Sequence, residues 1–306
     1  MECSSRWASS DGPVASRWRI AFSCEKAYVN WRESCIGRAL RVRIVSPRPS
    51  EPHVRTLAVI PARLGATRLP RKPLRLLAGV PLVVRVLERV ASLRLADRCI
   101  VATDSREIVD EVERAGGEAV LTDAAHPSGT DRVAEVASRT DCRGYHAIVN
   151  VQGDEPFVSA TAVRGALAQV TEQGFALGTA ALRAGPDVLR RPDVVKVVTA
   201  DDGAAMYFSR AAIPFLRDGA DAAERDARVL HHVGVYAYTP DALARWVALP
   251  VHPLERIERL EQLRPLAHGM RMGVAITDDT ARSGIDTEED LELANSQWAT
   301  FTTTES

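Results

Sequence analysis

From Thr56 onward, short β-rich apolar runs alternate with stretches of helical periodicity, and this alternation limits the fold more than any other feature. Strands are expected at 56–61, 99–103, 118–122 and 147–152, with helices between them at 81–93, 105–115 and 130–139. A strand followed by a covering helix returns to the sheet as a parallel strand. The alternation therefore predicts an α/β fold with an open, mainly parallel sheet flanked by helices, of the Rossmann-like α/β/α type.

The second half of the chain departs from this alternation. Further strands are expected at 177–183, 193–199, 204–209 and 232–239, and further helices at 159–172, 240–247, 253–267 and 287–297. Several of these strands follow one another without an intervening helix, which is typical of antiparallel additions. We expect a small antiparallel lobe that covers the site, within one domain over 56–298, and then a tail over 299–306.

Residues 1–55 are predicted to form a poorly ordered N-terminal extension. They hold three of the five cysteines and show little sustained periodicity. A transit peptide is an alternative because the segment is rich in Arg and Ser, although acidic residues such as Glu2 and Asp11 weaken that interpretation. A third alternative is an over-extended gene start, which would need a non-ATG codon because the next methionine is Met206.

The composition argues against a nucleic-acid or membrane protein. The 306 residues carry a formal net charge of −1, so a general nucleic-acid binder is not supported and the expected partner is small. No apolar run approaches the about 20 residues that span a bilayer, and the first residues lack a secretory signal. We expect a soluble, cytoplasmic protein whose five cysteines, which form no C-x-x-C pair, stay reduced.

The loop after the first strand is basic and rich in glycine and proline. Gly65 allows the backbone to approach a ligand closely, and Arg63, Arg68, Arg71 and Lys72 supply four cations that suit a triphosphate. Parallel sheets bind ligands at the carboxyl ends of their strands, where this loop lies. A solvated basic turn explains the same residues, and neither G-x-x-x-x-G-K-[ST] nor G-x-G-x-x-G occurs.

Two acidic turns supply candidate metal ligands. Asp154 follows the strand at 147–152, at the same sheet edge as the basic loop, and Asp286 precedes the last expected helix. Mg²⁺ takes oxygen ligands and is usually bound by one or two carboxylates beside nucleotide phosphates. If Asp286 faces Asp154, the pair forms a metal site. The alternatives are a simple turn at Asp154 and a helix N-cap at Asp286, supported by Glu289 three residues on.

The segment 126–132 reads HPSGTDR and leads into a helix. Ser128 and Gly129 can offer hydroxyl and backbone donors to a base or ribose, and Arg132 projects from the first helical turn. A loop with Thr130 as helix N-cap explains the same residues without a ligand.

In order and spacing, these segments resemble the 3-deoxy-manno-octulosonate cytidylyltransferases, the CMP-Kdo synthetases, from about Thr56 to Trp298. The matching segments are VIPARLGATRLPRKPL (59–74), HPSGTDR (126–132), NVQGDEP (150–156), VVKVV (194–198), MYFSRAAIP (206–214), HHVGVYAY (231–238), PLERIERLEQLR (253–264) and GIDTEEDLE (284–292). The resemblance implies a nucleotidyltransferase fold, and transfer of CMP from CTP to the anomeric hydroxyl of Kdo, with release of pyrophosphate, for lipopolysaccharide biosynthesis. It also implies a homodimer and Mg²⁺ as cofactor.

The same resemblance implies roles for individual residues. The catalytic residues would be Lys72, Arg63, Asp154 and Asp286, of which Asp154 and Asp286 would hold Mg²⁺. The nucleotide would be bound by Arg63, Arg68, Lys72, Ser128, Gly129 and Arg132. The acid sugar would be bound by Gln152, Arg210, His232, Tyr236, Glu261 and Gln262. Catalysis of this kind rests mainly on positioning and charge stabilisation.

Two residues depart from the family pattern, since Ala66 stands where serine is frequent and Arg71 where glycine is frequent. Both affect the expected affinity for CTP. The alternatives to Kdo transfer are a cytidylyltransferase for a related acid sugar such as 8-amino-Kdo, a glycosyltransferase and a non-catalytic nucleotide-binding relative. Glycosyltransferases typically carry Asp-x-Asp, whereas the strand here ends in Gly153-Asp154-Glu155.

Overall fold

The computed structural model describes residues 54–65, 68–279 and 284–304. Nearly all of the expected extension over 1–55 lies outside the described residues, as do Ala66 and the last two residues of the expected tail. Within the described part of the chain, no helix is long and apolar enough to cross a membrane.

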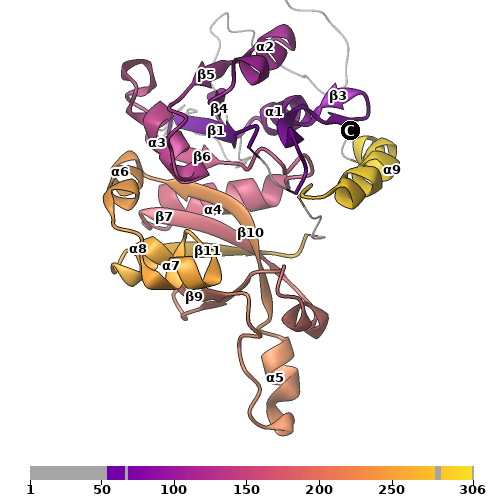
Figure 1. Cartoon of the computed structure of the whole chain (residues 1–306). Coiled ribbons are helices and arrows are strands. Elements are labelled where there is room, and N and C mark those ends of the chain that lie inside the picture. Colours follow the sequence, from indigo (N-terminus) through magenta and orange to yellow (C-terminus); the bar gives the residue numbers. More distant parts are fainter. Residues whose placement is uncertain (1–53, 66–67, 280–283, 305–306) are drawn as a thin grey trace, which may run out of the picture. The chain divides into compact units, whose positions relative to one another are not determined.

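The sheet is mainly parallel, as predicted (Figure 1). Its main path has the strand order β11-β7-β10-β6-β1-β4-β5. These strands are β1 (Thr56–Ala62), β4 (Arg98–Thr103), β5 (Ala119–Leu121), β6 (Ala147–Asn150), β7 (Leu177–Arg183), β10 (Leu230–Tyr238) and β11 (Met272–Thr277). Along this path β10 alone runs against the others, because it pairs antiparallel with both β6 and β7 whereas the remaining pairs are parallel.

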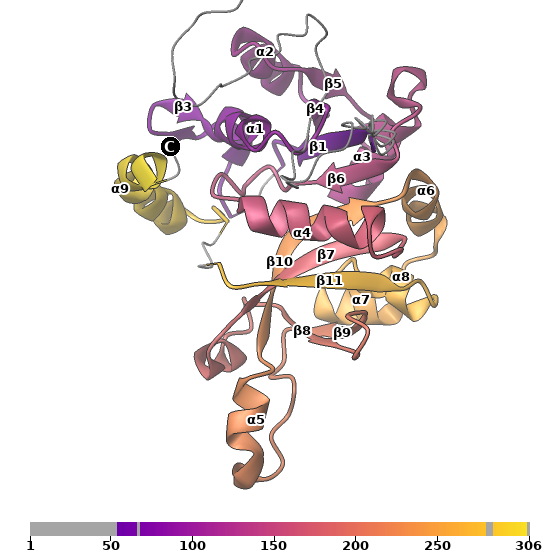
Figure 2. The same ribbon diagram turned by 180° about the vertical axis from the view of Figure 1, so that it is seen from behind.

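The two faces of the sheet carry separate apolar cores. Successive residues of a strand point to opposite faces. Accordingly, Ala58 and Ile60 of β1 pack with α1, α2, α4 and α9, whereas Leu57 and Val59 pack with α3, α6 and α8. Figure 2 shows α4 lying across one face of the sheet. A sheet covered on both sides explains why β1 is buried along its whole length.

Most helices lie close to their predicted positions, whereas the short helix over 222–226 was not predicted. Their bounds are α1 (Leu82–Ser92), α2 (Arg106–Arg114), α3 (Gly129–Ser138), α4 (Ala160–Thr171), α5 (Ala222–Asp226), α6 (Pro240–Ala248), α7 (Pro253–Glu258), α8 (Leu263–Ala267) and α9 (Glu288–Thr304). Short 3₁₀ turns lie at η1 (Lys72–Leu74), η2 (Thr140–Cys142), η3 (Pro186–Arg190) and η4 (Gly219–Asp221). Helix α9 continues past the predicted end at residue 297.

The predicted helix over 253–267 is wrong in its middle, where the structure has two helices, α7 and α8. Arg259 has a φ of 56° and ends α7 in the left-handed conformation. The apolar period continues across this break, because Leu260 and Leu263 are both buried in the same core. Periodicity alone therefore could not reveal it.

Short additional strands complete the fold. The antiparallel pair β8 (Lys196–Thr199) and β9 (Ala205–Ser209) extends the sheet from β10, as the pattern predicts. A separate hairpin joins β2 (Leu76–Leu77) to β3 (Val80–Pro81) through Ala78 and Gly79, both at positive φ. Neither this hairpin nor β11 was predicted, since both are short apolar runs without clear alternation.

Candidate active site

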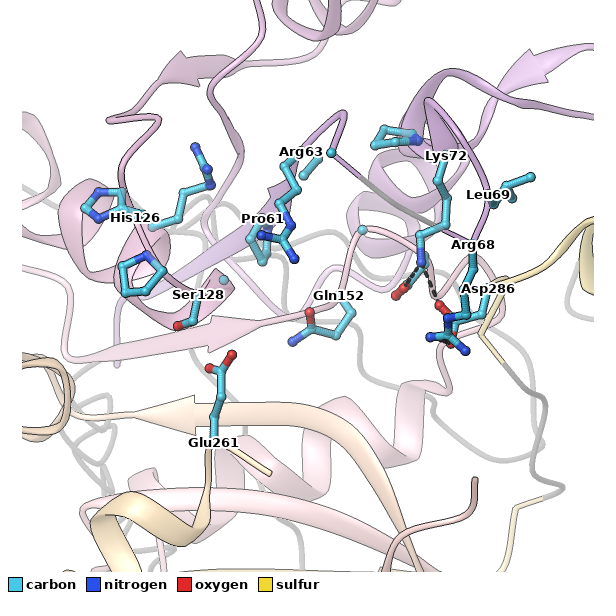
Figure 3. A pocket seen from close by; sticks show the side chains of 18 residues that line it. Pro61, Arg63, Arg68, Leu69, Lys72, His126, Ser128, Gln152, Glu261 and Asp286 are labelled. Atoms are coloured by element: carbon cyan, nitrogen blue, oxygen red, sulfur yellow. Dashed lines mark hydrogen bonds and ion pairs between the residues drawn. The ribbon is translucent and has the colours of Figure 1, made fainter. Parts of the chain in front are cut away.

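A cavity of about 390 Å³ opens at the carboxyl ends of β1 and β6 (Figure 3). Its wall is built from the basic loop, the start of α3 and the turn after β6, together with Glu261 and Asp286. The sequence placed the basic loop and the first acidic turn at this edge, and the structure brings them together. The antiparallel strands β8 and β9 contribute none of the described residues in this wall.

The basic loop after β1 places Lys72 against the acidic turns. Lys72 begins η1, and its Nζ donates to Asp154 Oδ2 at 2.5 Å and to Asp286 Oδ1 at 2.9 Å. Arg68 Nη2 donates to the other oxygen of Asp286, Oδ2, at 2.8 Å. Asp286 therefore faces Asp154, which was the condition for a shared site.

The charges at this junction favour one another's ionised forms. Burial works against the Lys72 ammonium, but the charge of Asp154 and the bonds to both carboxylates outweigh it and raise the pKa of Lys72. Burial likewise opposes ionisation of Asp286, yet the hydrogen bond and charge of Lys72, with Arg68, lower its pKa. The side chains of Lys72, Arg68, Asp154 and Asp286 thus form one compact cluster.

Arg71 does not line the cavity, although its charge and place in the loop predicted a contact with the triphosphate. Its side chain turns away and forms an ion pair with Glu107 of α2. Its backbone is left-handed, with a φ of 56°. Glycine adopts this conformation at little cost, which is a physical reason for glycine to be frequent at this position in the family pattern.

The two acidic turns are joined through their backbones. Ile285 N donates to Asp154 O at 2.9 Å. A side chain at position 284 would place its Cβ 2.8 Å from Glu155 Oε1, so glycine allows the turns to approach. Gly153 likewise allows the turn after β6 to approach the end of β1, because a Cβ there would lie 2.7 Å from Pro61 O.

The predicted N-cap role of Asp286 is wrong. Thr287 Oγ1 accepts from Asp290 N at 3.2 Å, and Asp290 Oδ2 accepts from the backbone N–H groups of Thr287 at 2.9 Å and Asp286 at 3.0 Å. Thr287 and Asp290 thus satisfy the start of α9 reciprocally. The carboxylate of Asp286 is left for Lys72 and Arg68.

Glu155 is a further acidic group at this junction and was not among the predicted site residues. Burial, together with the negative charges of Asp154 and Asp286, raises its pKa to about 8. Its place directly after Asp154 in the acidic turn was the available signal. Among the described residues, no group of three or more His, Cys, Asp or Glu side chains is arranged to hold a metal ion.

The start of α3 forms the other end of the cavity, and the predicted cap there is also wrong. Ser128 rather than Thr130 caps the helix, accepting from Asp131 N at 3.4 Å. Thr130 Oγ1 instead donates to Glu261 Oε2 at 2.8 Å. Burial raises the pKa of Glu261. The break between α7 and α8 thus places this carboxylate beside α3.

Arg132 and His126 also lie in the cavity wall, and both already have partners. The Arg132 guanidinium is buried and donates to Thr122 Oγ1 and, at 3.0 Å, to Asp104 Oδ2. His126 Nε2 lies 2.7 Å from Glu135 Oε2. Arg63 is exposed at the cavity wall.

Of the six residues expected to bind the sugar, Gln152 and Glu261 line the cavity. Arg210 lies outside its wall and donates to the backbone oxygens of Glu258 at 2.9 Å and Pro192 at 3.1 Å. The remaining three are His232, Tyr236 and Gln262, which also lie outside the described wall.

The buried His232 packs against the half-buried Tyr236 in the sheet. His232 Nε2 lies 2.9 Å from Thr179 Oγ1, and its ring centre is 5.5 Å from that of Tyr236. Burial lowers the pKa of His232 to about 3, so the imidazole is neutral. His231 has a lowered pKa as well, because of burial and of the nearby charge of Arg191.

The family profile and the similar proteins of known name are all cytidylyltransferases. Residues 57–272 match the cytidylyltransferase family profile. The chain is 60% identical over 242 residues to the 3-deoxy-manno-octulosonate cytidylyltransferase of Gemmatimonas aurantiaca, covering 79% of this chain and 93% of that protein. It is 45% identical over 249 residues to the protein of the same name from Rhodospirillum centenum, covering 78% and 91%.

A solved structure agrees with these relatives. The structure of a CMP:2-keto-3-deoxy-manno-octonic acid synthetase complexed with CTP matches with a TM-score of 0.73 and 35% identity, over 80% of this chain and 99% of that chain. The solved structure and the two relatives each cover about four-fifths of this chain. This chain belongs to the family of 3-deoxy-manno-octulosonate cytidylyltransferases.

Proposed function

We propose that this protein transfers CMP from CTP to the anomeric hydroxyl of Kdo, giving CMP-Kdo and pyrophosphate, and that the product serves lipopolysaccharide biosynthesis. The observation that carries the proposal is the contact of Lys72, in the basic loop, with both Asp154 and Asp286 at the wall of one cavity. Triphosphate-binding cations and metal-binding carboxylates are needed together in nucleotidyl transfer.

In the proposed reaction the anomeric oxygen forms a bond to the α-phosphorus, and the bond from that phosphorus to the bridging oxygen of pyrophosphate breaks. The hydroxyl proton is released. Arg63, Arg68 and Lys72 would bind the triphosphate and offset the charge that develops on the departing pyrophosphate. Ser128 and Gly129, at the other end of the cavity, would contact the nucleoside.

Asp154 and Asp286 fit a role as Mg²⁺ ligands. A single ammonium already lies within hydrogen-bonding distance of both carboxylates, so their oxygens converge on one cation position. When bound, Mg²⁺ would stabilise negative charge on the phosphate oxygens. Water and phosphate oxygens would supply its other ligands, because this ion usually keeps several waters.

Gln152 and Glu261 would contact the sugar from the cavity wall. The roles of Arg132, Arg210, His232, Tyr236 and Gln262 in substrate binding stay predictions. So do the homodimer and the cytoplasmic location. Gel filtration with light scattering would test the dimer.

The deciding experiment follows ³¹P NMR signals of CTP with Kdo and Mg²⁺. We expect pyrophosphate and a CMP phosphodiester to appear together. The same assay with 8-amino-Kdo, and with UTP or ATP in place of CTP, would identify a related acid sugar or another nucleotide. Absence of pyrophosphate with every acid sugar would leave a non-catalytic nucleotide-binding protein.

Substitution of the acidic pair tests the proposed metal ligands. We expect Asp154→Asn and Asp286→Asn each to lower the rate by at least about a hundredfold, the scale of losing a preorganised electrostatic contact. Asp241→Asn is the matched control, because Asp241 is exposed in the first turn of α6. Circular dichroism would verify folding. A near-native rate in either variant would remove that residue from the metal site.

A further inference from the structure

The cations of the basic loop are bonded to three of the four carboxylate oxygens of the acidic pair Asp154 and Asp286. Lys72 bonds to one oxygen of Asp154 and to one of Asp286, and Arg68 takes the second oxygen of Asp286. Both oxygens of Asp286 therefore have a cationic partner. The Lys72 side chain is only 16% exposed, so its ammonium is held at the cavity wall rather than in bulk solvent.

The same two cations are the proposed partners of the triphosphate. A divalent ion arriving alone must displace an ammonium that is paired twice, and it must also lose part of its tightly held water. A metal–triphosphate complex brings its own anion, which offers Lys72 and Arg68 a replacement for the carboxylates. The flexible stem of lysine allows its ammonium to move between the two partners.

We propose that Lys72, supported by Arg68, makes the acidic pair selective for the metal–triphosphate complex over the free metal ion. Selectivity is the difference between the affinity of the acidic pair for the metal–triphosphate complex and its affinity for the free metal ion. The ion pair with Lys72 lowers the affinity for the free ion. This inference rests on the proposed function. It adds that Lys72 weakens metal binding in the absence of nucleotide and strengthens nucleotide binding in the presence of metal.

Two measurements on the full chain test this role without relying on turnover. Mn²⁺ binding to the nucleotide-free protein is followed by electron paramagnetic resonance, with Lys72→Met as the variant because methionine keeps an apolar stem of similar length. We expect Mn²⁺ to bind Lys72→Met at least tenfold more tightly than the wild type. CTP affinity is measured by calorimetry in EDTA and in saturating Mg²⁺. We expect metal to tighten CTP binding in the wild type, and to do so much less in the variant, because the coupling is reciprocal.

Arg75→Met is the matched control. Arg75 follows η1 and pairs with Glu288 at 2.5 Å outside the cavity wall, so its loss changes the net charge equally. We expect its Mn²⁺ affinity to equal that of the wild type. The double variant Lys72→Met/Asp154→Asn should not show the tighter Mn²⁺ binding of Lys72→Met, because the carboxylate that Lys72 releases is then absent.

The outcomes are distinct. Equal or weaker Mn²⁺ binding by Lys72→Met overturns the inference, and so does an equal gain in Arg75→Met, which would mean a general charge effect. The proposed function is contradicted by a different result, namely that the wild type forms no CMP-linked sugar. A wild type that forms product while Lys72→Met gains no metal affinity refutes only the selective role of Lys72.

Discussion

At the scale of single residues, the buried His232 shows how one polar side chain is satisfied inside the sheet. The hydroxyl of Thr179 donates to Val235 O at 2.7 Å, so its oxygen can accept from His232 Nε2 at 2.9 Å. This pairing requires the proton on Nε2. The ring also packs edge-on against Phe208, with 4.8 Å between ring centres. Burial disfavours a charged imidazole at this position and so lowers the pKa of His232.

Stability should therefore depend on His232 in mildly acidic solution. Its folded-state pKa is about 3, below the ordinary value of 6.5, so the unfolded chain binds a proton that the folded protein refuses. The contribution of the neutral His232 to the free energy of unfolding is present above pH 6.5. It is lost as the pH falls from 6.5 towards 3. The slope for one proton is at most about 1.4 kcal/mol per pH unit.

His232→Gln isolates this contribution, because glutamine can still donate to Thr179 but does not titrate. Urea unfolding at pH 4.5, 5.5 and 6.5 should show a shallower loss of unfolding free energy in the variant than in the wild type. Parallel curves would mean that His232 is already protonated in the folded state.

At the scale of elements, the start of α9 determines how Asp286 is presented. In the cap at the start of α9, Asp290 Oδ2 accepts from the backbone N–H of Asp286. The backbone bond from Ile285 N to Asp154 O connects this turn to the turn after β6. Asp290 is therefore a positioning residue for Asp286, although its carboxylate is not part of the cavity wall.

We expect Asp290→Ala to lower the free energy of unfolding by about 1 kcal/mol, the usual cost of a lost cap. It should also raise several-fold the Mg²⁺ concentration that gives half-maximal rate, because Asp286 is less well placed. Glu289→Ala removes a carboxylate from the same helical turn and serves as control. If both variants shift the Mg²⁺ dependence equally, local charge rather than positioning is responsible.

The break between α7 and α8 shows what an element-level prediction misses. The apolar positions of 253–267 fit one helix, and the period continues through the break. The left-handed Arg259 nevertheless redirects the chain, and Glu261 comes to accept from Thr130 at the cavity. Nothing in the local pattern distinguishes this arrangement, since Arg259 is neither glycine nor proline.

At the scale of the whole described domain, close packing of α4 on the sheet brings the layers together. A Cβ at Gly178 of β7 would lie 2.3 Å from the backbone oxygen of Ala166 and 2.9 Å from Gln169 Cβ. Neither a backbone atom nor a Cβ can move aside without moving the helix. Gly178 therefore limits the distance between this helix and the strand beneath it.

Gly178→Ala should destabilise the protein by about 1 to 3 kcal/mol, the usual cost of overpacking a core. Gly185→Ala is the control, because no other atom lies within 4 Å of its added Cβ and its φ of −72° suits alanine. Urea unfolding of both variants checks the prediction. Equal stability of the two variants would show that α4 can shift on the sheet without cost.

The sequence by itself determined the alternation of strands and helices in the first half of the domain, the mainly parallel character of the sheet and the loops at the carboxyl ends of its strands. These follow from local signals, namely apolar periodicity, glycine and proline placement, and charge in a turn. It also indicated Lys72, Asp154 and Asp286 through the family resemblance. Only the tertiary structure decided that Lys72 joins the two carboxylates, that Thr287 rather than Asp286 caps α9, and that Arg71 turns to Glu107. Each of these depends on which partner is nearest in space, and residues 214 positions apart, such as Lys72 and Asp286, meet only when the chain has folded.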